Sequence, residues 1–184
     1  CRDLFFVQYL KYMHTNEGAF LALTRLLRDF PTEILWWPFW NAGIPYTHAY
    51  FPLLPAASAL VAAFGLETPA AFHTVCAIFY CLGPVAVFLM ASELSGRCWP
   101  SFAEALGYSL FSPSALLIPV VREDLGSLWN LRRMQSLVFY SEGPHVAALA
   151  LLPLAVLFVH RAMRGRRLAA VPALICIAGV VLTN

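Results

Sequence analysis

Residues 70–91 read AAFHTVCAIFYCLGPVAVFLMA, an apolar run that contains no aspartate, glutamate, lysine or arginine. Its length matches the ~17–25 residues that an α-helix needs to cross the hydrocarbon core of a bilayer. Similar apolar runs occupy residues 102–121, 145–159 and 168–183. We therefore expect an all-α fold, a polytopic bundle with four membrane-spanning helices.

The composition of the whole chain supports a membrane protein. Hydrophobic residues make up 60% of the 184 residues, charged residues only 12%, and the mean hydropathy is +0.70. Soluble domains have about 45–50% apolar and 25% charged residues. The net charge of +2 is too small to neutralise a phosphate backbone, which argues against nucleic acid as a partner. Four cysteines in or beside apolar runs form no CxxC pair and are expected to be small buried hydrophobes: Cys76, Cys81, Cys98 and Cys176.

The distribution of arginines predicts the topology. If residues 53–64 crossed the bilayer, strict alternation would place a cluster of four arginines outside, against the positive-inside rule: Arg161, Arg164, Arg166 and Arg167. We therefore expect residues 53–64 to lie in the outer interface. Residues 14–65 then form a first external loop and residues 122–143 a second one. Residues 1–13 are expected to be the outer end of a preceding span, and the chain is expected to be part of a longer protein.

The first external loop combines two kinds of interfacial segment. Between residues 16 and 30, Phe20, Leu23, Leu27 and Phe30 recur at three- and four-residue spacing, which predicts an amphipathic helix. An aromatic stretch follows, WWPFWNAGIP at residues 36–45, and then FPLL at residues 51–54. Tryptophan rings are typical of membrane interfaces because the ring is apolar while the indole N–H stays hydrated.

This order of elements resembles the GT-C superfamily of multispanning glycosyltransferases. The resemblance rests on an acidic residue after a span, an amphipathic helix, a W-P-x-W-x-x-G-x-P segment and a P-L-L interfacial helix. More narrowly, the chain resembles bacterial membrane proteins described as related to 6-pyruvoyl-tetrahydropterin synthase. This resemblance implies that the chain is a glycosyltransferase of the bacterial cytoplasmic membrane and that its donor is a polyprenyl-phosphate-linked sugar.

The resemblance also implies roles for residues in the first external loop. In such enzymes an acidic residue of this loop acts as catalytic base or helps to hold a divalent metal ion and the donor phosphate, and here Glu17 fits that position. Many members carry Asp-Glu there, whereas Asn16 precedes Glu17 here. Alternatively, Glu17 stabilises a helix dipole from the first turn. His48 precedes the P-L-L helix. Two roles are expected there: contact with a phosphate or an acceptor, or a plain interfacial histidine.

The second external loop holds a mixture of ionisable residues. Carboxylates of this loop are candidates for binding a sugar, and arginines bind diphosphate because the guanidinium group presents a planar fork of donors. An ordinary solvated loop would carry a similar mixture. The candidate substrate-binding residues are Asn16, His48, Arg122, Glu123, Asp124, Glu142 and His145, with Arg132 and Arg133 in the same loop. Within the predicted spans Glu104 is ionisable, near an inner end.

Two other function classes compete with glycosyl transfer. A transporter would carry charges at broken helices near the bilayer midplane, and the sequence places no charge next to Pro84 or Pro113. A non-catalytic relative would keep the fold for assembly or lipid binding. Motifs of serine hydrolases, zinc proteases and nucleotide-binding proteins do not occur in the sequence.

Overall fold

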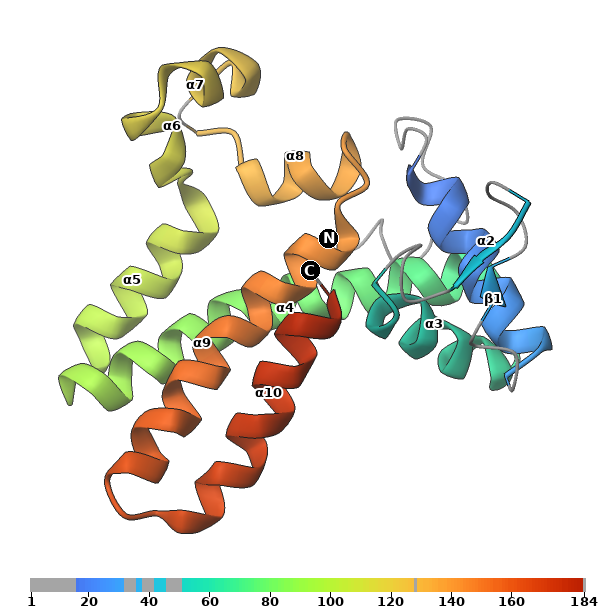
Figure 1. The fold of residues 1–184 in the computed structure, drawn as a ribbon. Coiled ribbons are helices and arrows are strands. Elements are labelled where there is room, and N and C mark those ends of the chain that lie inside the picture. Colours follow the sequence, from blue (N-terminus) through green and yellow to red (C-terminus); the bar gives the residue numbers. More distant parts are fainter. Residues whose placement is uncertain (1–15, 32–35, 38–41, 46–50, 128, 184) are drawn as a thin grey trace.

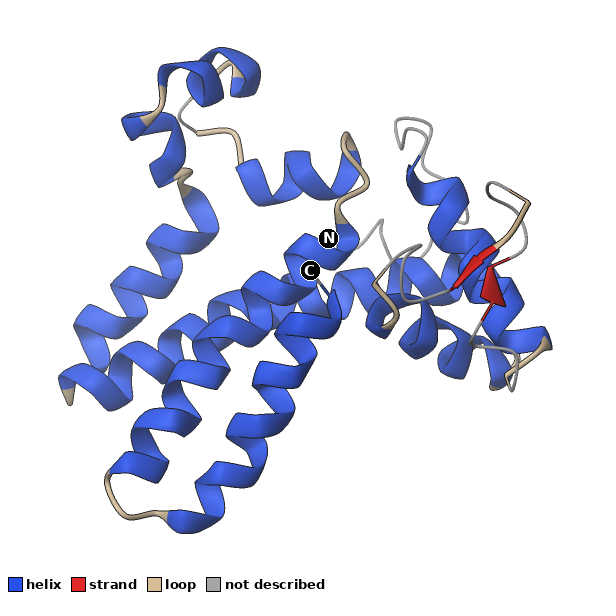
Figure 2. Cartoon of the chain, viewed as in Figure 1, coloured by secondary structure: helices blue, strands red, loops and turns tan. Residues whose placement is uncertain are grey.

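The computed structural model describes residues 16–31, 36–37, 42–45, 51–127 and 129–183, and most of these residues are helical. The predicted all-α class is therefore confirmed. The strands of the described residues form one small hairpin, in which β1 (Trp36–Trp37) pairs antiparallel with β2 (Ile44–Pro45). Figure 2 shows how little of the chain is extended.

The amphipathic helix predicted at residues 16–30 is α2 (Asn16–Asp29), which packs against α3 (Leu53–Ala63). Its apolar stripe is buried at Phe20, Leu23 and Leu27. Phe30 was expected to continue the stripe, but the helix ends one residue earlier and Phe30 is exposed. At ~1.5 Å per residue the 11 residues of α3 cover about half of a ~30 Å hydrocarbon core. Its interfacial position stays a prediction.

Three helices form the main bundle: α4 (Thr68–Ser95), α9 (Gly143–Met163) and α10 (Ala170–Thr183). The last of these is preceded by a short 3-10 turn, η2 (Arg167–Ala169). In Figure 1 the helix α9 runs beside both α4 and α10. Several small side chains of α4 and α9 are fully buried, and small residues allow helix backbones to approach closely: Ala71, Ala77, Ala147 and Ala150. Among the described helices, α4 and α9 are long and apolar enough to cross a membrane.

The predicted single helix at residues 102–121 is a series of shorter helices. They are α5 (Cys98–Leu110), α6 (Pro113–Leu117) and α7 (Pro119–Leu125), and α8 (Arg132–Val138) follows them. Proline lacks a backbone N–H and disfavours helical geometry in the preceding residue, which explains the breaks before Pro113 and Pro119. Ser112 stabilises the first break, because its hydroxyl donates to Asn130 O at 2.9 Å and accepts from Arg132 N at 2.7 Å. These bonds anchor the start of α8 to the end of α5.

Candidate functional site

A buried acid and histidine join α2 to α4. Glu17 lies in the first turn of α2, and its Oε1 is 2.5 Å from Nε2 of His73 in the second turn of α4. Glu17 is 1% exposed and His73 is fully buried. A carboxylate removed from water needs a hydrogen-bonding partner, and the imidazole supplies one. In the described part of the chain no group bonds to Glu17 Oε2, so one oxygen is fixed and the other is free.

The sequence did not predict the burial of Glu17. The residue does lie in the first turn of a helix, where its charge is favourable to the helix dipole, but it faces inward. Its partner His73 was missed. A signal for it existed in the sequence: His73 is the one histidine in the apolar run 70–91, and a basic side chain there needs a partner once it is buried.

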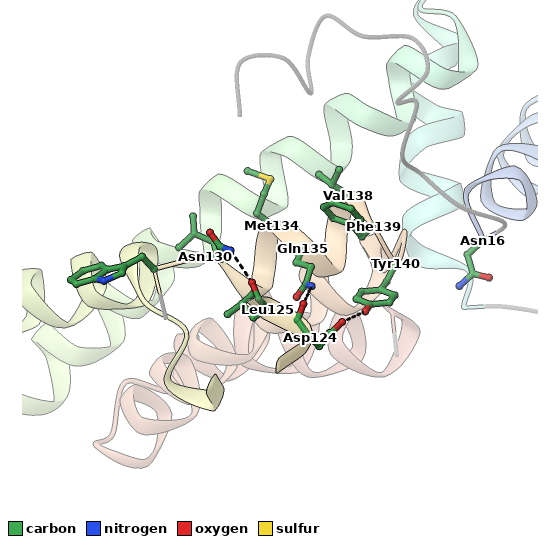
Figure 3. Close-up of a pocket in the computed structure, with 11 residues that line it drawn as sticks. Asn16, Asp124, Leu125, Asn130, Met134, Gln135, Val138, Phe139 and Tyr140 are labelled. Carbon is green, nitrogen blue, oxygen red and sulfur yellow. Dashed lines mark hydrogen bonds between the residues drawn. The ribbon is translucent and has the colours of Figure 1, made fainter. Parts of the chain in front are cut away.

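A cavity of about 960 Å³ lies between the start of α2 and the segment α7–α8, and neither Glu17 nor His73 lines it. Asn16, which precedes Glu17, lines it from α2, and Figure 3 shows Asp124, Gln135 and Tyr140 on the opposite elements. The rest of the lining is mostly apolar: Leu125, Trp129, Leu131, Met134, Val138 and Phe139. Apolar walls with a few polar groups are typical of sites for small ligands.

Asp124 is the centre of a hydrogen-bonded network at this cavity. The Tyr140 hydroxyl donates to its Oδ1 at 2.6 Å, and the Arg132 guanidinium donates to its Oδ2. Gln135 accepts a bond from Arg132 at 2.7 Å and donates to the Asp124 carbonyl at 3.0 Å. The Tyr140 hydroxyl, and after it Arg132, hold the pKa of the Asp124 carboxyl below its ordinary value because both stabilise the ionised form. The network joins α7 to α8.

A second cavity, of about 680 Å³, lies on the other side of α8, against α5 and α9. Its lining includes Glu142 and His145, as well as Arg132 and Arg133. Tyr140 lines both cavities. The predicted binding residues are thus divided, with Asn16 and Asp124 at the first cavity and Glu142 and His145 at the second.

Other predicted residues lie elsewhere. Arg122 and Glu123 are exposed on α7 and line neither of these two cavities. Glu104 is exposed on α5. His48 and Trp40 lie outside the described residues, as does the predicted preceding span at residues 1–13. Cys76 and Cys176 are buried as expected, but Cys81 and Cys98 are exposed, because an apolar neighbourhood in sequence does not decide which side of a helix faces its partner.

Arg133 enters the bundle at a point where α4 lacks one of its own hydrogen bonds. Pro84 has no N–H to donate to the carbonyl of Tyr80, four residues earlier. Arg133 Nη2 donates to that carbonyl at 2.7 Å. The guanidinium carbon lies 4.5 Å from the Tyr80 ring centroid and 4.4 Å from that of Tyr108, at cation–π distance.

Gly83 is what allows this approach. A Cβ at that position would lie 2.4 Å from Arg133 Nη2, too close for any real contact. The arginine therefore connects α8 to α4 and α5. The sequence did not predict a charge beside Pro84, and the structure corrects this, because the cation comes from a residue 49 positions later in the chain (133 − 84 = 49).

The described residues do not by themselves provide a site for the divalent metal ion that the family resemblance implies. Within the described ranges no group of three or more His, Cys, Asp or Glu side chains could hold a metal. The facing atoms of Glu17 and His73 bond to each other.

Comparisons with known proteins return no match: no family model, no curated protein and no solved structure is similar to this chain.

Proposed function

We propose that this protein is a membrane-embedded glycosyltransferase that transfers a sugar from a polyprenyl-phosphate carrier to an acceptor at the external face of the bacterial cytoplasmic membrane. The observation that carries the proposal is Glu17: His73 fixes one carboxylate oxygen, no described group bonds to the other, and the preceding residue Asn16 lines a cavity of about 960 Å³. A positioned carboxylate of this kind suits general-base catalysis.

A membrane location is supported by the apolar helices. In the most apolar windows of α4 and α9, only 44% and 33% of residues are buried within the chain. The core helix of a soluble protein would be mostly buried. A bilayer, or further helices within it, would cover the remaining apolar surface.

In the proposed reaction Glu17 Oε2 accepts the proton of the acceptor hydroxyl. The acceptor oxygen forms a bond to the anomeric carbon of the sugar, the bond from that carbon to the carrier phosphate breaks, and the phosphate leaves with the electron pair. His73 donates Nε2–H to Oε1 and fixes the orientation of the carboxylate. Since Glu17 is 1% exposed, α2 has to move relative to α4 before an acceptor reaches Oε2.

The second cavity is a suitable place for the carrier phosphate. Arg132 and His145 supply basic groups there, and Val146 and Leu149 supply an apolar wall for the polyprenyl chain. Guanidinium groups bind phosphate oxygens through paired donors. Tyr140 lines both this cavity and the one that Asn16 lines, so the two proposed sites share this side chain.

The proposal is tested on the full-length protein. Mass spectrometry of the purified protein should detect bound polyprenyl phosphate, and turnover of the carrier-linked sugar in membranes should fall ~10²–10⁴-fold in Glu17→Gln, the usual contribution of a general base. Glu67→Gln is the matched control, because Glu67 is an exposed carboxylate before α4. His73→Gln keeps an amide donor near the position of Nε2 and should retain more activity than Glu17→Gln. Full turnover in Glu17→Gln, or no bound carrier lipid, would contradict the proposal.

One observation favours a transporter as the second candidate. Arg133 places a cation beside Pro84, where the continuous helix α4 lacks one backbone hydrogen bond, and charges at interrupted helices mark transport pathways. Its guanidinium group already has a carbonyl and two aromatic rings as partners, which suits a structural role better. Substrate uptake into proteoliposomes without consumption of a carrier lipid would favour transport.

A further inference from the structure

A third cavity, of about 640 Å³, lies at the opposite end of the bundle from α8, where α9 turns into α10. Its lining combines three arginines with apolar side chains: Phe158, Arg161, Gly165, Arg166, Arg167, Leu168 and Ala169. Gly165 has φ +86°, a left-handed conformation that glycine adopts without strain, and in this turn Arg166 N donates to the Arg161 carbonyl of α9 at 3.1 Å.

Only one of these arginines is neutralised by a carboxylate. Arg161 donates to Glu93 Oε2 through Nε at 3.0 Å and Nη2 at 2.6 Å, which ties α9 to the end of α4. Arg166 and Arg167 are exposed and form no ion pair with any described residue. Glu93 also interacts electrostatically with Arg166, and three arginines with one carboxylate leave two net positive charges at the cavity.

The apolar surface around the cavity is equally exposed. Leu168, which lines it, is 89% exposed, and Met163 and Val171 on either side of the turn are 82% and 60% exposed. Two free guanidinium groups above apolar side chains match the two parts of a phospholipid, an anionic headgroup and acyl chains. Free phosphate would need the charges alone and would leave the apolar wall uncovered.

We propose that this cavity binds the headgroup phosphate of an anionic phospholipid, with Arg166 and Arg167 on the phosphate and the acyl chains along Phe158 and Leu168. Basic pockets between helices at the cytoplasmic side of membrane proteins bind such headgroups. The site depends on the membrane location of the protein but not on glycosyl transfer. Arg164 is exposed on the same turn but does not line the cavity, so the proposed site does not include it.

The experiment compares two double variants of equal charge loss in the purified full-length protein. Native mass spectrometry with phosphatidylglycerol and phosphatidylcholine gives the lipid affinity. In Arg166→Gln/Arg167→Gln, phosphatidylglycerol should bind roughly 30-fold more weakly, since each arginine near an anionic lipid contributes ~1 kcal/mol. The control Arg164→Gln/Arg97→Gln removes two exposed arginines outside the cavity and should change the affinity less than threefold.

Three outcomes would overturn the site. Equal losses in the two double variants would mean a general charge effect, and equal binding of phosphatidylcholine would mean no headgroup recognition. Inorganic phosphate that displaces phosphatidylglycerol at comparable concentrations would identify a free-anion site. Arg166→Lys/Arg167→Lys preserves the charge and should keep most of the phosphatidylglycerol binding. If the glutamine variant does not fold, loss of this binding in the lysine variant would contradict the site.

Discussion

The interaction between Arg133 and the backbone of α4 at Pro84 can be measured as an energetic coupling between these two residues. Arg133→Met removes the donor to the Tyr80 carbonyl and both cation–π contacts while keeping an apolar stem of similar length. Hydrogen bonds to charged groups contribute ~1.5–3 kcal/mol, and partly exposed cation–π pairs add about 0.5–1 kcal/mol each. Because Arg133 is only half-buried, we expect its loss to destabilise the protein by about 2–3 kcal/mol.

Pro84→Ala is the second arm of a double-mutant cycle. Alanine restores an N–H that bonds to the Tyr80 carbonyl, so the hydrogen bond from Arg133 becomes partly redundant. In this background Arg133→Met should destabilise the protein by about 1 kcal/mol less than in the wild type, which is the share of the hydrogen bond. The assay is reversible unfolding in mixed micelles, followed by circular dichroism. Additivity within ~0.5 kcal/mol would refute the idea that Arg133 replaces the missing helix bond.

Gly83→Ala tests the same geometry without touching the arginine. In a helix interior alanine is normally ~1 kcal/mol more favourable than glycine. Here the new Cβ would lie 2.4 Å from Arg133 Nη2, so the substitution should destabilise the protein instead. Gly107→Ala in α5 is the matched control, since its Cβ would meet only a Phe111 ring atom at 3.9 Å and should follow the ordinary preference. Stabilisation by both substitutions would contradict the close approach of Arg133.

Three further measurements test the topology and the Asp124 network. A cysteine at position 164 should react with impermeant reagents only from the cytoplasmic side, because clustered arginines resist translocation. Cysteines at positions 51 and 66, both exposed, should react from the external side if α3 lies in the interface. The pKa of Asp124 is lowered in the folded protein, so the ionised carboxylate and its hydrogen bonds stabilise α7 and α8 at neutral pH. This stabilisation is lost as the pH falls through the lowered pKa. Tyr140→Phe should raise this pKa, measured by carboxyl NMR, and move the loss to higher pH; an unchanged pKa would exclude Tyr140 as the main cause.

The helices of the chain were largely predictable because their signals are local. Apolar length marked α4 and α9, and three- and four-residue spacing marked α2. The failure at residues 102–121 is also local in origin. The hydropathy of this stretch predicts one long helix, whereas Pro113 begins α6 and Pro119 begins α7. Proline position was therefore the better guide to the helix ends in this stretch.

The candidate site was predictable in composition but not in arrangement. Asn16, Asp124, Glu142 and His145 do lie at cavities, and the acidic residue at position 17 does lie in the first turn of a helix. Which face of each helix turns inward depends on packing with distant elements, and single-sequence reasoning contains no information on that packing. His73 and Arg133 were missed for this reason, since each is defined by a partner at least 49 residues away.

Local sequence alone determined that this chain is helical, that it is strongly apolar, and that most of its ionisable residues lie between the apolar runs. Hydropathy and helical periodicity depend on neighbours within a few turns. Only the tertiary structure decided that Glu17 is buried against His73 and that Arg133 donates to the carbonyl left free by Pro84. Both pairings remove polar groups from water. Such groups are stabilised only where a partner from another helix meets them at hydrogen-bond distance, and helix packing sets that distance.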